Sequence, residues 1–244
     1  AQLVARLTAV GQKTLQAASP LPTVEPPRPS PAEVAEVRAG RPVVRVERLG
    51  TAYRLHVLEA DRTGLFADLA GLFAASGVTV RSAQLRTVDG LAVDEWVVES
   101  PLGETPDPAA LSRGLAKLSE GDRGPLAQLT RRRHSQLAAA AQTTPGAPST
   151  AATGRPGMTR AMMLPEASTQ ATVIEVRATD RKGLLHDLGT AITGAGLSVR
   201  SAHIATYAGQ ALDTFYLTRA DGAPLAPAEV GRTIATLIDA ADGR

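Results

Sequence analysis

The sequence contains no cysteine, few aromatic residues and no long apolar run. Without cysteine the chain can form no disulfide, no thiolate metal site and no cysteine nucleophile. The apolar runs are too short to span a bilayer, and the start shows no signal-peptide pattern, so we expect a soluble, cytoplasmic protein. The formal net charge of +2 is too small to indicate a nucleic-acid partner by itself.

One nine-residue segment occurs twice, and the chain is organised around the two copies. The first is residues 61–69, Asp-Arg-Thr-Gly-Leu-Phe-Ala-Asp-Leu, and the second is residues 180–188, Asp-Arg-Lys-Gly-Leu-Leu-His-Asp-Leu. The offset of 119 residues (from 61 to 180) holds without a gap over more than thirty positions. Two copies at this spacing indicate a duplication that produces two domains rather than a solenoid of short repeats.

The apolar pattern predicts the same order of elements in both copies: strand, strand, helix, strand, strand, helix. In the first copy the expected strands are 42–48, 53–59, 78–87 and 91–98, and the helices are 64–76 and 108–118. In the second copy the expected strands are 160–164, 172–178, 197–207 and 211–218, and the helices are 183–195 and 227–240. A short helix at 31–39 is expected to end at Gly40, which suits a left-handed cap.

The third strand of each copy has an irregular apolar pattern. Within residues 80–85 of the first copy, the apolar residues move from one face of the strand to the other. The same change occurs within residues 199–204 of the second copy. A strand with a period of two can do this only with an extra residue or a bend. We therefore predict a β-bulge near Ser82 and another near Ser201.

From its second strand onward, each copy reads strand, helix, strand, strand, helix, which is most of a ferredoxin-like split βαβ unit, so the fold class is α+β. That fold normally ends with a fourth strand, for which the second copy leaves no room after its last helix. We predict that the strand preceding each copy fills this position. The expected organisation is a helix end and proline-rich spacer (1–41), a first ferredoxin-like domain (42–120), a helix and flexible linker (121–159) and a second ferredoxin-like domain (160–244). Because the chain begins at Ala1 in what resembles the middle of a helix, we expect a fragment of a longer protein.

The repeated Asp-x-x-Gly-Leu segment lies between a strand and the start of a helix. A helix start leaves N–H groups unpaired and carries partial positive charge, which suits a carboxylate or phosphate. Asp61 and Asp180 could accept a hydrogen bond from an ammonium group, and together these features match a free α-amino acid. The alternative is that each aspartate caps its own helix, the usual role of such a residue.

Both copies resemble ACT domains, the small-molecule-sensing modules of amino-acid metabolism. The signature of that family is an Asp-x-x-Gly-Leu turn, a glycine followed by alternating apolar residues, and an Asp-x-aromatic strand. The matching positions are Asp61, Gly64, Leu65, Gly77, Val78, Val80, Asp94 and Trp96, and then Asp180, Gly183, Leu184, Gly196, Leu197, Val199, Asp213 and Phe215. The tandem pair after a proline-rich spacer is similar to the C-terminal region of the uridylyltransferase/uridylyl-removing enzymes that modify the PII nitrogen-signalling protein.

The resemblance covers roughly residues 42–240 and implies a regulatory function in nitrogen metabolism. It implies that an amino acid, glutamine in that setting, binds between paired domains and allosterically controls an attached nucleotidyltransferase that modifies a PII-type protein. The pairing could occur within one chain or between chains. The resemblance also implies that two kinds of residue bind the ligand: those of the motif turns and those at the strand starts, whose backbones face the same loop. The motif-turn residues are Asp61, Arg62, Gly64, Leu65, Asp180, Arg181, Gly183 and Leu184, and the strand-start residues are Gly77, Val78, Gly196 and Leu197.

The catalytic motifs of those enzymes do not occur in the sequence. There is no Gly-Ser-x-Gly-x-x-Asp nucleotidyltransferase motif and no His-Asp hydrolase motif, and the four histidines are scattered without metal-binding spacing. We therefore expect no catalytic residue, metal or cofactor in this stretch. The identity of the amino acid, the number of copies that bind it, and the choice between uridylylation and adenylylation stay open.

Two other functions are compatible with a ferredoxin-like fold. An RNA-binding module would use aromatic residues of the central strands as stacking platforms, which would make Trp96 and Phe215 candidates. We expect these two residues to be core residues instead, and we expect neither a nucleic-acid nor a membrane partner. A ligand-free dimerisation module is the second alternative, because fold alone does not establish function.

Overall fold

The computed structural model describes residues 28–100, 103–127, 129, 131 and 159–243. The elements before and within the first copy are α2 (Pro31–Arg38), β1 (Val43–Leu49), β2 (Ala52–Ala60), α3 (Leu65–Ala75), β3 (Thr79–Gln84), β4 (Thr87–Val88), β5 (Leu91–Glu99) and α4 (Pro108–Ser119), followed by a short 3-10 helix, η1 (Gly124–Leu126). The second copy contains β6 (Arg160–Met163), β7 (Thr172–Thr179), α6 (Leu184–Gly194), β8 (Leu197–Tyr207), β9 (Gln210–Arg219) and α7 (Pro227–Asp242). Most of the expected spacer and linker lies outside the described residues.

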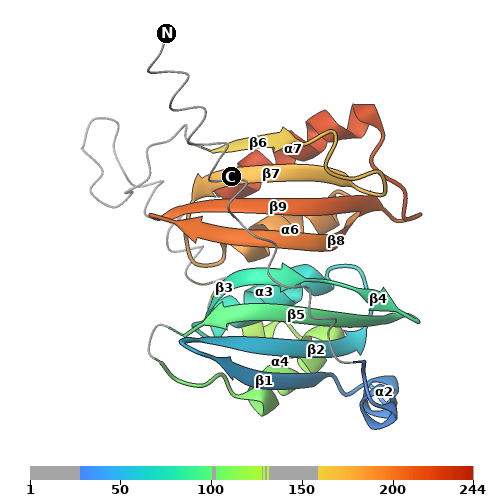
Figure 1. Cartoon of the computed structure of the whole chain (residues 1–244), viewed down its shortest axis with the longest axis vertical. Helices are drawn as coiled ribbons and strands as arrows, with labels where there is room; N and C mark the ends of the chain where they lie inside the picture. The colour runs from blue at the N-terminus through green and yellow to red at the C-terminus, as the bar shows by residue number, and fades with distance from the viewer. Residues whose placement is uncertain (1–27, 101–102, 128, 130, 132–158, 244) are drawn as a thin grey trace.

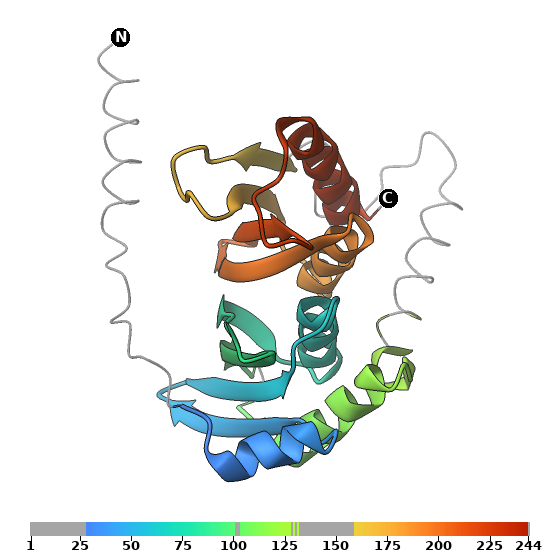
Figure 2. The same cartoon turned by 90° about the vertical axis from the view of Figure 1, so that its right-hand side faces the viewer.

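One continuous antiparallel sheet runs through both copies, in the order β1-β2-β5-β3-β8-β9-β7-β6, and β4 pairs with β5 (Figure 1). Helices α3, α4, α6 and α7 lie on one face of this sheet, and α2 lies beside the edge strand β1 (Figure 2). The fold class is therefore α+β, as the sequence predicts. No helix in the described part of the chain is both long and apolar enough to cross a membrane.

The prediction about the preceding strands is confirmed. β1 pairs with β2 along seven residue pairs, and β6 pairs with β7 along four. Each therefore occupies the sheet position beside the first strand of its copy, which a fourth strand fills in a ferredoxin-like unit. Both strands thus form the outer edges of the joint sheet.

The predicted bulges are also present. The register of β3 against β5 shifts between Val80 and Ser82, and that of β8 against β9 shifts between Val199 and Ser201. The extra residues are therefore Arg81 and Arg200. A bulge of this kind changes the direction in which nearby side chains project.

The strand expected at 78–87 is shorter than predicted, because β3 ends at Gln84. At this point the backbone N–H of Arg86 donates to Oδ1 of Asp94 at 3.3 Å. This side-chain oxygen replaces one ladder acceptor, while the carbonyl oxygen of Arg86 still accepts from the N–H of Val93 at 2.8 Å and β4 continues in the same register. In the second copy, β8 runs unbroken from Leu197 to Tyr207 as predicted.

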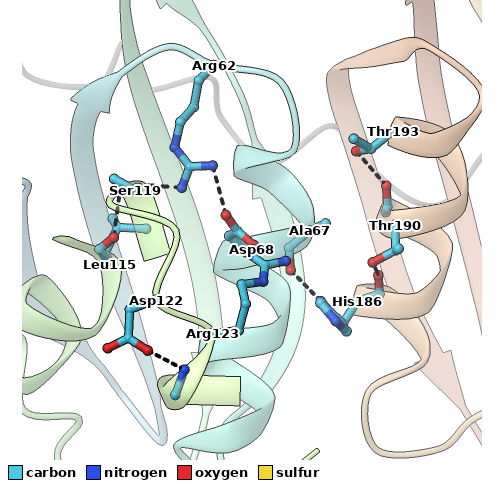
Figure 3. Close-up of polar contacts among 12 residues, drawn as sticks. Arg62, Ala67, Asp68, Leu115, Ser119, Asp122, Arg123, His186, Thr190 and Thr193 are labelled. Atoms are coloured by element: carbon cyan, nitrogen blue, oxygen red, sulfur yellow. Dashed lines mark hydrogen bonds and ion pairs between the residues drawn. The ribbon is translucent and has the colours of Figure 1, made fainter. Parts of the chain in front are cut away.

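Equivalent residues of the two copies meet each other where the copies touch. Ala83 of β3 pairs with Ala202 of β8, and these residues are 119 positions apart. On the helical layer, His186 of α6 donates from Nδ1 to the carbonyl oxygen of Ala67 of α3 at 2.7 Å, again across 119 positions (Figure 3). Contacts between equivalent positions are the mark of a twofold arrangement, so the two copies are related by an approximate twofold axis.

A single apolar core extends across both copies. Phe66 of α3 stacks on Trp96 with ring centroids 5.5 Å apart and meets Phe215 of the second copy edge-on at 5.9 Å. Trp96 and Phe215 are fully buried on the helical side of the sheet. The interpretation of both as core residues is therefore confirmed, and neither offers a stacking surface.

Candidate ligand-binding clefts between the two copies

Two clefts lie where the copies meet, and each has walls from both. The cleft beside the second motif turn, called the Asp180 cleft, has a volume of about 490 Å³ and is lined by residues 180–185 and by residues 77–80 of the first copy. The cleft beside the first motif turn, called the Asp61 cleft, has a volume of about 660 Å³ and is lined by residues 61–66 and by residues 197–200 of the second copy. The approximate twofold axis therefore relates the two clefts.

This arrangement brings together most of the residues singled out from the sequence, but across the copies rather than within them. The strand-start residues of one copy face the motif loop of the other. The Asp61 cleft combines Asp61, Arg62, Gly64 and Leu65 with Leu197. The Asp180 cleft combines Asp180, Arg181, Gly183 and Leu184 with Gly77 and Val78. Gly196 lines neither cleft.

Each motif turn begins its helix with a left-handed glycine. Gly64 has φ 83° and Gly183 has φ 84°, and each is the N-cap residue of its helix without a side-chain cap. Only glycine adopts this conformation at little cost. Asp61 and Asp180 therefore do not cap their helices, and the capping interpretation is wrong. Residues of both helix starts line the clefts, and of their N–H groups those of Leu65 and Leu184 donate to the carbonyl oxygens of Arg62 and Arg181.

The two motif aspartates differ in how they are engaged. Oδ2 of Asp61 accepts a hydrogen bond from Oγ1 of Thr87 at 2.6 Å. The carboxylate of Asp180 has no hydrogen-bond or ion-pair partner among the residues that the structure describes. Asp180 is thus the more available acceptor for an ammonium group.

The motif arginines are paired with the acid of their own helix. Arg62 contacts Asp68 at 2.8 Å (Figure 3), and Arg181 contacts the equivalent Asp187 at 2.7 Å. Arg123 approaches the other oxygen of Asp68 at 2.6 Å. These ion pairs are partly buried and hold the turn against its helix, so the motif arginines have a structural role.

A buried carboxyl group lies in each cleft, contributed by the Asp-x-aromatic strand. Asp94 is 5% exposed and Asp213 is 2% exposed. Burial, reinforced by the nearby charge of Asp61, raises the pKa of Asp94 to about 8. Burial and the charge of Asp180 raise the pKa of Asp213 to about 7. At neutral pH Asp94 therefore mostly retains its proton and can donate a hydrogen bond.

Asp94 and Asp213 belong to the family signature, but the signature alone predicted no role for them in the cleft. A signal was present, because an aspartate between inward-facing apolar positions of a strand must be buried with them. Ala92 and Trp96 share the face of Asp94, and both are buried.

Each cleft can therefore complement an α-amino acid. The helix start provides N–H donors for a carboxylate, the motif aspartate provides an acceptor for an ammonium group, and the buried carboxyl provides a further polar group. No group of three or more His, Cys, Asp or Glu side chains that could hold a metal ion occurs in the described part of the chain.

The fold defines a class of protein, an α+β chain whose antiparallel sheet and helices are compatible with ferredoxin-like domains. Comparison with known proteins relates it to a particular group. The chain is 38% identical over 172 residues to the "Bifunctional uridylyltransferase/uridylyl-removing enzyme" of Streptomyces coelicolor, covering 68% of this chain and 19% of that enzyme. It is 35% identical over 179 residues to the enzyme of the same name from Azospirillum brasilense, covering 71% and 18%.

The chain thus corresponds to one region of these bifunctional enzymes and spans less than a fifth of their length. No protein-family model matches it. Among solved structures, an unknown protein from Galdieria sulphuraria aligns with 78% of this chain and 91% of its own at a TM-score of 0.23 and 14% identity, which is too distant to support an argument.

Proposed function

We propose that this chain is the regulatory region of a bifunctional uridylyltransferase/uridylyl-removing enzyme and senses glutamine through two ACT-type domains. In this proposal, residues 42–120 and 160–244 are the two domains. The attached nucleotidyltransferase modifies a PII-type signalling protein, and glutamine bound to this region controls it. The names of the related enzymes and the ACT signature support the regulatory assignment.

One observation carries the proposal: the motif turn of each copy and the strand start of the other line the same cleft. A ligand in either cleft contacts both copies at once and therefore favours one relative packing of them. A ligand shifts an equilibrium by its differential affinity for the two states. Coupling of this kind is typically worth about 1–3 kcal/mol, enough to bias an attached catalytic part.

The Asp180 cleft is the better candidate for glutamine, because its polar groups suit a neutral amino acid. The α-carboxylate would meet the N-terminus of α6, and the ammonium group would meet the unpaired carboxylate of Asp180. Removing the acceptor charge should therefore weaken binding, by about tenfold or more for a hydrogen bond to a charged group.

Isothermal titration calorimetry of the 244-residue chain with L-glutamine, and with L-glutamate and L-serine for comparison, tests this function. We expect saturable binding of glutamine that the variant Asp180→Asn weakens by about tenfold or more. Asp107→Asn is a matched control, because Asp107 is the exposed N-cap of α4 and asparagine caps a helix equally well. Absence of glutamine binding by the wild type, or equal affinity in both variants, would contradict the proposal.

A further inference from the structure

The two clefts differ in charge although the axis relates them. Three arginines besides the motif arginine line the Asp61 cleft: Arg86, Arg200 and Arg219. At the equivalent positions the other half of the duplication has Ala205, Arg81 and Ser100, and none of these lines the Asp180 cleft. The cationic residues that line the Asp180 cleft are Lys182 and Arg181, which is paired with Asp187.

The bulge residues show how the difference arises. Arg81, in the first copy, contacts Glu99 at 2.5 Å. In the second copy Thr218 occupies the position of Glu99, so the acid that would neutralise Arg200 is missing. Arg200 is exposed, lines the Asp61 cleft, and has no acidic partner in the ranges that the structure describes.

The other two arginines add to this positive charge. The guanidinium group of Arg86 also has no acidic partner among the described residues. Arg219 pairs only with the exposed Asp221, at 3.3 Å, and its buried Nε has no hydrogen-bond acceptor in the described part of the chain. One oxygen of the Asp61 carboxylate, Oδ2, accepts a hydrogen bond from the hydroxyl group of Thr87. The cleft thus has an excess of positive charge and unused donors.

We propose that the two clefts have different specificities: the Asp61 cleft binds an acidic amino acid, and the Asp180 cleft binds a neutral one. The inference rests on the proposed function, since it assumes that both clefts hold the α-amino and α-carboxylate groups in the same way. The arginines then receive the second carboxylate. The larger volume of the Asp61 cleft, about 660 Å³ against about 490 Å³, is compatible with its additional polar contacts.

L-glutamate and L-glutamine are suitable probes, because they have the same length and differ only by a carboxylate in place of an amide. Calorimetric titrations of the 244-residue chain should compare the wild type with Arg200→Ala and Arg86→Ala. Arg81→Ala is the matched control, since Arg81 holds the equivalent bulge position and lines neither cleft. Increasing salt should weaken glutamate binding more than glutamine binding, because the second carboxylate adds a screened interaction.

We expect Arg200→Ala or Arg86→Ala to weaken glutamate binding by about tenfold or more and to leave glutamine binding unchanged. Arg81→Ala should change neither. Glutamate affinity that is equal in the wild type and in both cleft variants would overturn the inference while glutamine binding still supported the proposed function. Failure of the wild type to bind either amino acid would instead overturn the proposed function, and this inference with it.

Discussion

Replacing Asp94 with asparagine should stabilise the protein at neutral pH. Asp94 is buried in the sheet beside the Asp61 cleft, and its pKa is raised from 3.8 to about 8. The folded state thus keeps a proton that the unfolded chain has already released at pH 7. Asparagine has nearly the same shape, cannot ionise, and retains an oxygen for the backbone N–H of Arg86.

The sign and the size follow from proton linkage. Because the folded pKa lies above the unfolded one, the free energy of unfolding falls as the pH rises from about 4 to about 8. Each pH unit in this window costs about 1.4 kcal/mol, which amounts to about 4 kcal/mol at pH 7. Asp94→Asn removes this cost, so its advantage over the wild type should grow from below about 1 kcal/mol at pH 4 to about 4 kcal/mol at pH 7.

Urea unfolding between pH 4 and pH 9 measures this difference. Trp96 is the only tryptophan of the chain and is fully buried, so its fluorescence reports unfolding of the core around Asp94. Asp89→Asn is a suitable control, since Asp89 is exposed in the neighbouring hairpin turn and its φ of 50° suits asparagine. An advantage of Asp94→Asn that is the same at pH 5 and pH 8 would show that the carboxyl is not protonated in the folded state, contrary to this prediction.

Three further outcomes follow from the same structure. Asp213→Asn should behave like Asp94→Asn, but its advantage should level off near pH 7, where Asp213 titrates, as the same urea series would show. Gly189→Ala should destabilise the protein by about 1–3 kcal/mol in urea unfolding, because the new Cβ would lie 2.8 Å from Phe66, whereas Gly194→Ala in the same helix meets nothing and should be neutral or stabilising. Asp68→Asn should lower the melting temperature through a loss of about 1–2 kcal/mol, since asparagine keeps an acceptor oxygen but removes the charge that pairs with the partly exposed Arg62 and Arg123; an unchanged melting temperature would show that solvent screens these pairs.

The elements of the fold could be predicted from the sequence because local rules determine them. Alternating apolar residues predicted the strands, and the same pattern occurs at equivalent positions of both copies. Even the bulges at Arg81 and Arg200 were visible, since a change of apolar parity within a strand requires an extra residue. The early end of β3 was not visible, because the hydrogen bond found there joins Arg86 to the side chain of Asp94, eight residues away in the sequence.

The clefts could be predicted only in part. The motif turns were recognised as candidate sites, but the sequence does not show which strand edges pair between copies. The joining of β3 to β8 places Gly77 and Val78 beside Asp180 instead of beside Asp61. The role of Asp61 was also ambiguous until the structure showed a left-handed Gly64 in the capping position.

The duplication determines how ligand occupancy of the clefts would depend on protein concentration. Because one polypeptide supplies both walls of each cleft, dilution cannot separate them, and the second wall is present at the high effective concentration of an intramolecular partner. Occupancy would then depend on the amount of metabolite and not on the amount of protein. A cell could change the expression level of such a sensor several-fold without shifting the ligand concentration at which it responds.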